Sequence, residues 1–472
     1  MSGAAVAALE GLSAPAWLVG GAVRDRLLGR TPVPGAVADL DVVVDGDVAS
    51  AARTVAQRAG GFGFELSEAF GAWRVVARDR SWQLDLLGLG GETIEDDLAR
   101  RDFTVNAIAL RLPEDAGAWV DPFGGRSDLE RRRLRMVAPG AFAADPLRTL
   151  RLARLACELG FAAQDETARA ARASADALRG VAPERVFAEL RRIVCADRAL
   201  DGLALMTAIG ATEVVLPELI ALEGVQQSRY HHLDVSGHTE AVLSATIRLA
   251  ADPSPICRSD AEAETVRARL DEPLADEMTR GQALRFGALL HDIAKPQTRG
   301  VTSSGRVSFL GHDEAGAVQS AAILERLRAS QRLREYVAAL TRHHLRLGFL
   351  VHRMPLPRRA IYDYLDACSP VGVDVTLLSV ADRLATRGDN AARAIALHVS
   401  LARELLPDAL AWETAPPRPP VRGDELARAL GIEPGPILGE LLAELRAESF
   451  SGEVTGPRAA VDRARQLLAQ RK

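Results

Sequence analysis

The sequence predicts an α+β protein, in which a small mixed sheet with helices forms a head and a long all-helical region follows it. Up to about residue 138, short segments rich in β-branched residues are mixed with helical ones; beyond Asp145, Ala, Leu, Arg and Glu at helical spacing dominate to the end. A chain of 472 residues that is 48% hydrophobic can bury several separate cores. The predicted domains are a head at residues 1–138, a helical neck at 139–215, a helical body at 216–413 and a helical tail at 421–472.

The first predicted elements are a strand, a glycine turn and a helix. Residues 17–19 are expected to form a short buried strand, and a helix is expected at 23–28. Gly20 and Gly21 permit the tight turn between them, and Arg24 lies in the first turn of the helix. This combination predicts a phosphate-binding turn.

The next predicted strand, residues 37–44, carries a pair of carboxylates. Because side chains alternate along a strand, Asp39 and Asp41 share one face. Two neighbouring carboxylates repel each other unless a cation lies between them, and Mg²⁺ prefers such oxygen ligands and shares them with phosphates. Asp85, in a predicted strand at 81–87, would join the same metal site if its strand were adjacent; an exposed strand carboxylate is the alternative.

Further elements of the head follow from the same periodicities. A helix is predicted at 48–59 and a strand at 72–76, and the run DPFGGRSDLERRRLR predicts a turn followed by a basic helix at 128–135. A strand is also predicted at 105–110, after the motif ARRDFTVNAIAL. In this motif Arg101 could meet a triphosphate and Asp102 a ribose hydroxyl, with Asn106 nearby; a salt-bridged strand start is the alternative.

A predicted helix at 145–161 opens the helical part of the chain. Arg148, Arg151 and Arg154 recur every three residues and form an arginine ridge, for which an anionic partner is one explanation. Asp145 and Arg148 together could present an acceptor and donors to one base edge. Such a pair matches cytosine and adenine but not uracil or guanine, so that protein side chains would serve as the template.

The ordered motifs GGAVRD, DLD, RRDFTVNAIA, DPFGGRSDL and DPLRTLRLARL resemble motifs A to D of class II tRNA nucleotidyltransferases, the CCA-adding enzymes and their poly(A) polymerase relatives. The resemblance implies a polymerase-β-like head and a neck, body and tail that hold the acceptor arm and elbow of tRNA. It implies Mg²⁺ at the catalytic residues Asp39 and Asp41, with CTP and ATP as substrates. The residues implied to bind nucleotide are Gly20, Gly21, Arg24, Arg101, Asp102, Asn106, Asp145, Arg148, Arg151 and Arg154.

Two departures from the family pattern bear on specificity. Ala144 stands where the family usually has glutamate before Asp145, and the segment GLGGETIEDDLA is shorter than the flexible loop of full CCA-adding enzymes. The shortened form resembles enzymes that add only the two cytidines, so a separate enzyme would add the terminal adenosine. Full CCA addition, A addition and poly(A) polymerase activity remain alternatives, although the basic signature typical of the last is not found in GFGFELSEAFGAWRV.

A second constellation of possible ligands lies in the predicted body. Imidazoles and carboxylates are a common ligand mixture for divalent metals. The ordered pattern resembles the HD phosphohydrolase superfamily, which implies a divalent metal whose identity the residues do not specify. An inert scaffold domain is the alternative, and an HD phosphohydrolase with a degenerate head is the alternative for the whole chain. The implied ligands are His238, His291, Asp292 and Asp382, with His312 and His343 for a second metal.

Composition excludes several other classes of protein. The net charge of −5 argues against a protein that coats DNA or RNA, although it permits a local basic face. The four cysteines are widely separated, so neither a disulfide framework nor a zinc ribbon is expected. The sequence has no apolar run of membrane-spanning length and no signal peptide, which predicts a cytoplasmic protein without membrane contact. A nonenzymatic RNA-binding protein is disfavoured by two metal-ligand patterns in one chain.

Overall fold

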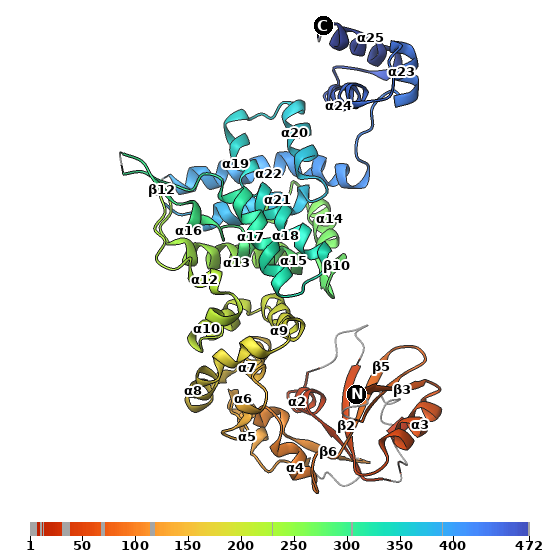
Figure 1. Cartoon of the computed structure of the whole chain (residues 1–472), viewed down its shortest axis with the longest axis vertical. Coiled ribbons are helices and arrows are strands. Elements are labelled where there is room, and N and C mark those ends of the chain that lie inside the picture. Colours follow the sequence, from red (N-terminus) through yellow and green to blue (C-terminus); the bar gives the residue numbers. More distant parts are fainter. Residues whose placement is uncertain are drawn as a thin grey trace. The chain divides into compact units, whose positions relative to one another are not determined.

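The computed structural model describes residues 7–9, 12, 14–30, 38–67, 71–113, 119–228, 230–303, 305–388 and 390–470. The chain divides into two compact units, Met1–Val215 and Leu216–Lys472. The first holds a mixed sheet and the helices that follow it, and the second is almost entirely helical (Figure 1). The predicted α+β class is therefore confirmed.

The head is built on a seven-stranded sheet with the order β3-β4-β5-β2-β1-β6-β7. Strands β2 and β5 run parallel, and the other neighbouring pairs are antiparallel. Helix α3 (Val48–Ala59) packs on β3, β4 and β5 and buries the side chains of Leu40, Val75 and Leu84 on that face. The strands are β1 (Ala16–Val19), β2 (Ala38–Val44), β3 (Phe62–Ser67), β4 (Ala72–Val76), β5 (Trp82–Gly88), β6 (Ala109–Leu112) and β7 (Trp119–Val120).

Helix α2 (Gly21–Leu27) begins two residues before the predicted helix at 23–28, so that Gly21 belongs to the helix, whereas α3 and β4 have the predicted bounds. Residue 37, which the sequence analysis placed in the second strand, lies outside the described residues. The edge strand β3 was not predicted. Its signal was the alternation of Phe62, Phe64 and Leu66 with glycine and polar residues, in a stretch whose glycines weaken a strand prediction.

Two predicted elements of the head are only partly correct: β6 covers residues 109–110 of the strand predicted at 105–110, and α5 covers residues 128–130 of the helix predicted at 128–135. Residues 104–106 form a 3₁₀ helix (Thr104–Asn106) instead of a strand, because the Thr104 hydroxyl donates to Asp128 and the Asn106 amide donates to Asp102. The predicted basic helix at 128–135 ends at Glu130 in α5 (Gly125–Glu130). Beyond it, Arg133 and Arg135 turn back to donate to the buried Asp128 carboxylate, and Arg133–Leu134 form strand β8 paired with β9 (Ala162–Ala163).

The helices after the head pack around α7 (Arg148–Leu159), whose Leu150, Leu152 and Leu155 are fully buried. Helices α9 and α10 both pack on α7. Gly160 ends α7 with a left-handed conformation at φ 70°, a common helix C-terminal geometry. The other helices of this region are α6 (Ala141–Ala144), α8 (Asp165–Ala173), α9 (Pro183–Cys195), α10 (Ala199–Ala208) and α11 (Thr212–Val215).

The second unit is organised around α21 (Gly372–Ala385), which is buried along most of its length. Helices α13, α15, α18 and α22 pack against it, and α17 pairs with α18. The acidic segment 252–276 contains a packed helix, in which Ala263, Val266 and Leu270 are buried. The helices of the body are α12 (Pro217–Ile220), α13 (Val235–Ala251), α14 (Asp260–Leu270), α15 (Arg280–Leu290), α16 (Lys295–Thr298), α17 (His312–Arg326), α18 (Gln331–His343), α19 (Arg346–Leu350), α20 (Arg358–Cys368) and α22 (Ala391–Thr414).

Three helices after the proline-rich segment 414–420 form a small core of their own: α23 (Gly423–Leu430), α24 (Pro436–Phe450) and α25 (Gly456–Ala469). The Arg359 guanidinium on α20 donates to both carboxylate oxygens of Glu444 on α24, at 2.7 and 3.0 Å. Among the described residues no single helix is long and apolar enough to cross a membrane; α20 and α21 meet that test only as a pair bent by 99°.

Candidate functional sites

The carboxylates of the head lie on one face of two adjacent strands. The parallel pairing of β2 with β5 places Asp85 opposite Asp41, so the condition under which Asp85 could approach the metal site is met. Asp39 is exposed and accepts a hydrogen bond from the Gln83 amide at 3.1 Å. The Arg74 guanidinium donates to both oxygens of Asp85 at 2.7 Å, which compensates the charge of Asp85.

Asp41 carries the most perturbed carboxylate of this group. Burial, and then the negative charge of Asp39, raise the pKa of Asp41 to about 6, while Arg101 and Arg151 act in the opposite direction. Gly20 has a φ of +71°, and a Cβ there would lie 3.1 Å from Asp41 Oδ2, so glycine is required both by the backbone and by the close approach of the carboxylate. A divalent cation would relieve the repulsion between Asp39 and Asp41.

A chain of hydrogen bonds joins four of the predicted nucleotide-binding residues. Arg24 Nη1 donates to Asn106 Oδ1 at 2.8 Å, and Asn106 Nδ2 donates to Asp102 Oδ1 at 3.1 Å. The other oxygen of Asp102 accepts from Arg151 Nε at 2.8 Å. Burial opposes ionisation of Asp102, but Arg151 and these hydrogen bonds hold its pKa below the ordinary value. The network therefore holds Arg24 and Arg151 with groups of the protein itself, without an external anion, and Arg151 is close enough to Asp41 to act on its pKa.

The arginine ridge of α7 is balanced by carboxylates of the protein itself. Arg154 is buried and donates to Glu189 at 2.6 Å and to Glu158 at 3.0 Å. Carboxylates of the protein itself therefore balance Arg151 and Arg154, so the close spacing of the three arginines does not by itself require an anionic partner. The third, Arg148, donates to the backbone carbonyl oxygens of Arg100, Arg101 and Ala141.

Asp145 precedes α7 rather than lying within it, which corrects its predicted placement on one side of that helix with Arg148. Its backbone is extended, with φ −146° and ψ 103°, and its Oδ1 accepts from the Leu147 amide at 3.2 Å. Its Oδ2 accepts from Arg185 of α9 at 2.9 Å. The sequence analysis did not identify Arg185, which lies in a basic and acidic helix where no periodic signal distinguishes it. Of the remaining predicted residues, Arg101 donates to Asp97 at 3.0 Å, and Gly21 begins α2.

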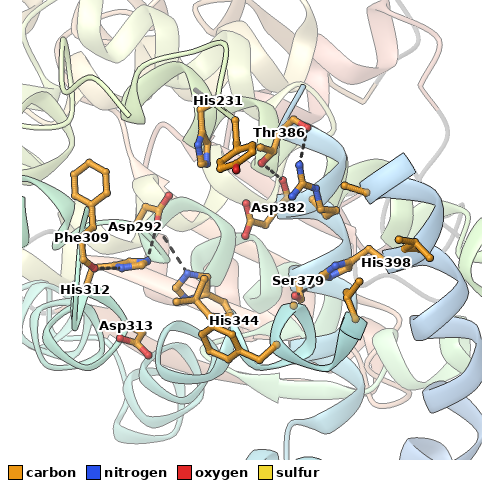
Figure 2. A pocket seen from close by; sticks show the side chains of 18 of the residues that line it. His231, Asp292, Phe309, His312, Asp313, His344, Ser379, Asp382, Thr386 and His398 are labelled. Atoms are coloured by element: carbon orange, nitrogen blue, oxygen red, sulfur yellow. Dashed lines mark hydrogen bonds and ion pairs between the residues drawn. The ribbon is translucent and has the colours of Figure 1, made fainter. Parts of the chain in front are cut away.

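A buried cluster of imidazoles and carboxylates occupies the body. Asp292, which follows the end of α15, is at its centre. Figure 2 shows it beside His312 and His344. Its Oδ2 lies 3.1 Å from His291 Nε2 and 3.6 Å from His238 Nε2, and its Oδ1 lies 3.3 Å from His312 Nε2. Asp382 Oδ1 on α21 lies 3.0 Å from His238 Nε2. Four separate helices therefore bring together the predicted residues of this cluster.

The predicted second-metal residue His343 lies outside the cluster, and His344 occupies that place instead. His344 is buried and its Nε2 lies 3.8 Å from Asp292 Oδ1, whereas His343 accepts a hydrogen bond from Arg346 at the protein surface. The buried stripe of α18 includes Leu333, Val337 and Leu340, and helical spacing continues it to 344 rather than 343. That stripe was the signal in the sequence that could have identified His344.

Backbone carbonyls fix the orientation of three of these rings. The Nδ1 atoms of His291, His312 and His344 donate to the carbonyl oxygens of Ala288, Phe309 and Thr341 at 2.8, 2.6 and 2.6 Å. A carbonyl can only accept, so the proton of each neutral ring is on Nδ1 and the Nε2 lone pair faces Asp292. Metal-ligating histidines typically donate their other ring N–H to a carbonyl or carboxylate in this way, which fixes the orientation of the ring.

The ligand atoms of this cluster fit a bound divalent metal. Among the described residues, the buried Nε2 atoms of His238, His291 and His312 and the Asp292 Oδ1 atom have no hydrogen-bond partner of suitable geometry. Acceptors that face one another in a buried space repel unless a proton or a cation lies between them. Two groups of three ligand atoms share Asp292: one with His238 and His291, the other with His312 and His344.

A cavity of about 860 Å³ opens beside the cluster, and Asp292, His312, His344 and Asp382 form part of its wall. Lys295 also lines it and lies 2.6 Å from Asp292 Oδ2. Farther from the cluster, Ser379 Oγ and His398 Nε2 lie 3.1 Å apart, and burial lowers the pKa of His398 to about 4. The cavity therefore combines possible metal ligands with the cationic side chain of Lys295 and the neutral imidazole of His398. This combination suits an anionic substrate.

A sheet carrying paired carboxylates and a helical unit carrying an HD-type cluster define a nucleotidyltransferase joined to an HD domain. Family models match the same regions: "Poly A polymerase head domain" at residues 16–135, "Probable RNA and SrmB- binding site of polymerase A" at 160–222 and "HD domain" at 235–387. Nucleotidyltransferase and HD domains usually use divalent metals, in agreement with the ligand groups described above.

Proteins similar over nearly the whole chain identify the family more closely. The chain is 36% identical to the A-adding tRNA nucleotidyltransferase of Deinococcus radiodurans, covering 94% of this chain and 93% of that protein. It is also 36% identical to the CC-adding tRNA nucleotidyltransferase of Thermus thermophilus, covering 93% of this chain and 90% of that protein. The chain thus belongs to the tRNA nucleotidyltransferase family.

Solved structures agree on the fold. A CCA-adding enzyme in its apo form superposes with a TM-score of 0.65 at 18% identity, covering 99% of this chain and 92% of the other. The Thermotoga maritima CCA-adding enzyme complexed with tRNA superposes with a TM-score of 0.61 at 19% identity, covering 98% and 94%. Similarity at this level of identity concerns the fold alone.

Proposed function

We propose that this enzyme adds the two cytidines to the 3′ end of tRNA from CTP and adds the terminal adenosine poorly. The observation that carries the specificity is the segment after β5. It is a short capped turn in which the Thr93 hydroxyl accepts from the Asp96 amide and the Asp96 carboxylate accepts from the Thr93 amide. Ile94 and Leu98 of α4 (Ile94–Ala99) are buried, so the turn is anchored to the core.

This turn differs from the longer flexible loop of full CCA-adding enzymes. The family resemblance implies that such a loop drives the change from cytosine to adenine. A base-reading pair built on Asp145 and Arg148 must shift to accept the larger adenine ring. A short turn held at both ends can move little, so it can contribute little to that shift. The two relatives described above, one A-adding and one CC-adding, are equally identical to the chain, so overall identity does not favour either specificity.

We also propose roles for the residues of the head. We assign Asp39 and Asp41 as ligands of Mg²⁺, with Asp85 beside them in contact with Arg74. When bound, Mg²⁺ activates the primer hydroxyl and neutralises charge on the phosphates. The residues assigned to hold the nucleotide are Gly20, Gly21, Arg24, Arg101, Asp102, Asn106, Asp145, Arg148 and Arg151, whereas Arg154 supports α7 from within the core.

The other partners belong to the same proposal. The neck and tail would hold the acceptor arm and elbow of tRNA, and the enzyme would act in the cytoplasm, where CTP, ATP and tRNA are found. A separate A-adding enzyme would complete the 3′ end.

The test is a pair of extension reactions with the full chain. We expect a tRNA ending at the discriminator base to gain two cytidines from CTP, whereas a tRNA already ending in CC gains adenosine from ATP slowly and incompletely. Rapid stoichiometric addition of one adenosine would reject the CC-only specificity and leave full CCA addition. Addition of adenosine to CC-ended tRNA, without cytidine addition to the shorter one, would instead identify an A-adding enzyme.

The buried cluster of the body favours a second activity, metal-dependent hydrolysis of phosphate esters. It is carried by the unpaired ligand atoms around Asp292 and by the adjoining cavity with Lys295. Protein treated with EDTA and supplied with Mg²⁺, Mn²⁺, Co²⁺ or Ni²⁺ in turn should hydrolyse bis(p-nitrophenyl) phosphate with at least one of them. If none of the ions raises the rate of hydrolysis above that of the metal-free protein, the activity is excluded and a scaffold role is favoured.

A further inference from the structure

The edge strand β3 exposes two aromatic rings that the head does not use for its own packing. Phe62 is 68% exposed and Phe64 is 47% exposed. Leu66, beside an irregularity in the strand, is 45% exposed. An aromatic ring buries 150–250 Å² in a core, so two exposed rings on adjacent positions of one face need an explanation.

The strand register places both rings on the face that carries the catalytic carboxylates. Cross-strand partners in a sheet point to the same side. Two contacts verify this here, because Arg74 reaches Asp85 and Gln83 reaches Asp39 across neighbouring strands. Two rows of side chains therefore run over the four strands β3, β4, β5 and β2: Phe62, Val76, Gln83 and Asp39 in one, and Phe64, Arg74, Asp85 and Asp41 in the other.

The opposite face of these strands is closed by α3. Gly63, between the two rings in sequence, points toward that helix, where an added Cβ would lie 3.4 Å from the Cβ of Ala56. The open face is thus the continuous surface between the rings and the carboxylates. Three strand spacings separate β3 from β2, about 14 Å, a distance that a few unpaired nucleotides can cover.

We propose that Phe62 and Phe64 form a stacking platform for unpaired nucleotides near the 3′ end of the RNA, whose last hydroxyl lies at Asp39 and Asp41; this rests on the proposed nucleotidyltransferase function. Aromatic residues on the open face of a four-stranded sheet are a recurring way to hold single-stranded RNA. The ring faces accept any base. The guanidinium of Arg74, between Phe64 and Asp85, is already bound by the carboxylate, so the platform supplies stacking rather than phosphate contacts.

Continuity with the reaction site favours RNA over a protein partner as the occupant. The RNA chain that is extended at Asp41 has to leave the carboxylates along some surface of the protein. This face of the sheet leads directly from the carboxylates to the two rings. A second copy of the chain paired along the edge of β3 is the competing occupant.

The test compares RNA binding by the full-length wild type and the Phe62→Ala/Phe64→Ala double variant, without nucleotide triphosphates. The two probes are acceptor-stem minihelices, one with an unpaired 3′ end that finishes in CC and one with a blunt end. We expect the double variant to bind the unpaired end about tenfold more weakly and the blunt end within about twofold of wild type. Both positions are exposed, so the fold should tolerate the change.

Two further variants separate stacking from general apolar contact. Phe62→Tyr/Phe64→Tyr keeps the ring faces and should bind like wild type, and Leu66→Ala removes apolar area without a ring and should change binding less than about twofold. Equal binding of the unpaired end by wild type and the alanine variant overturns the proposal. A change of oligomeric state by light scattering with unchanged RNA binding assigns the face to a second copy and also overturns it.

The proposed function fails separately from the platform. If wild type does not prefer the unpaired end over the blunt one, the assignment of the RNA 3′ end to this head is wrong. If wild type shows the preference and the alanine variant keeps it, only the platform is wrong. The wild-type protein thus reports on the function, and the variant reports on the rings.

Discussion

The two candidate metal sites of this chain differ in how completely the protein itself builds them. In the head, Asp39 is exposed and the neighbouring Asp85 is already paired with Arg74. In the body, His238, His291 and Asp292 are almost fully buried, and their facing atoms lack hydrogen-bond partners. The head therefore offers few ligands next to open space, whereas the body offers an enclosed nitrogen and oxygen cage.

This difference indicates when each ion would bind. Mg²⁺ usually keeps several waters and completes its coordination with substrate phosphates, which suits the open carboxylates of the head. A cage of oriented imidazoles holds an ion without substrate, because carbonyl bonds such as that from His291 to Ala288 fix the rings in advance. We therefore expect a metal that remains with the body during purification and a metal that is exchanged at the head.

The largest expected effect is on the head. Asp41→Ala or Asp39→Ala should lower the rate of CTP incorporation by at least about a thousandfold, because a carboxylate ligand at the reacting phosphate is lost. Binding of tRNA and hydrolysis by the body should stay within about twofold of wild type. Steady incorporation by either variant at saturating Mg²⁺ would contradict the assignment of these carboxylates.

The second prediction uses a matched pair of neighbouring histidines in the body. His344→Ala should lower the bound metal per chain, measured by mass spectrometry, and reduce ester hydrolysis by about 100-fold, because a ligand directed at Asp292 is removed. His343→Ala should change neither, since its ring lies at the surface with Arg346. Incorporation of CTP should be unaffected in both variants.

The double change His291→Ala/Asp292→Ala tests whether the metal site of the body acts independently of the site in the head. It should eliminate hydrolysis while cytidine addition continues at the wild-type rate. Loss of both activities in a folded protein would mean that the two sites depend on each other.

The sequence predicted the parts of this picture that depend on periodicity and on ordered motifs. The alternation in β2 placed Asp39 and Asp41 together, and α3 had its predicted bounds. The prediction failed where a single buried polar group decides the backbone. Arg133 and Arg135 bind Asp128, so the segment predicted as a basic helix forms a turn and a strand instead. No local sequence pattern indicates that the Asp128 carboxylate is buried.

The candidate sites were also predicted only in part. The motifs identified Arg24, Asn106, Asp102 and Arg151, but not the chain of hydrogen bonds that joins them, because that depends on the sheet register and on α7 together. The pairing of Asp145 with Arg185 links residues 40 positions apart and leaves no trace in either local segment. The distinction between His343 and His344, by contrast, was already present in the apolar stripe of α18.

The third prediction concerns the pH dependence of the head alone, measured by calorimetry in the His291→Ala/Asp292→Ala background. Binding of Mg²⁺ requires ionised Asp41, whose pKa is raised to about 6 by burial and by Asp39. The apparent affinity should therefore be near its maximum above pH 7 and fall about tenfold by pH 5. Arg101→Ala, which removes a charge that lowers this pKa, should move the midpoint to higher pH.

The sign of the linked stability effect is opposite to that of an ordinary salt-bridged aspartate. A folded pKa above the unfolded value means that the metal-free folded state binds more protons between about pH 4 and 6. The metal-free protein should thus lose stability as pH rises through this window. A midpoint of Mg²⁺ binding near pH 4 would contradict the raised pKa.

A smaller effect is expected from Arg185, which holds the Asp145 carboxylate. In Arg185→Ala this carboxylate can rotate, so discrimination of CTP against UTP, measured as the ratio of kcat/KM values, should fall about fivefold to tenfold. Arg179→Ala, an exposed arginine in the same unit whose partner Asp176 lies 3.7 Å away, should leave the ratio unchanged. An unchanged ratio in Arg185→Ala would mean that the remaining bond from the Leu147 amide suffices to orient Asp145.

The smallest expected effect on activity tests whether the segment after β5 is a fixed turn or a mobile lever. In Gly91→Ala the new Cβ would lie 2.4 Å from the Cβ of Asp96, so the capped turn at Thr93 has to open. We expect a loss of about 1–2 kcal/mol in the free energy of unfolding of the head, while cytidine addition stays within about twofold of wild type. Gly180→Ala, where no atom lies within 4 Å of the added Cβ, provides the control for stability. If the segment instead moves during each addition, we expect the reverse result: stability is unchanged and the choice between CTP and ATP shifts. A mobile segment can relieve the clash, but the clash slows its movement.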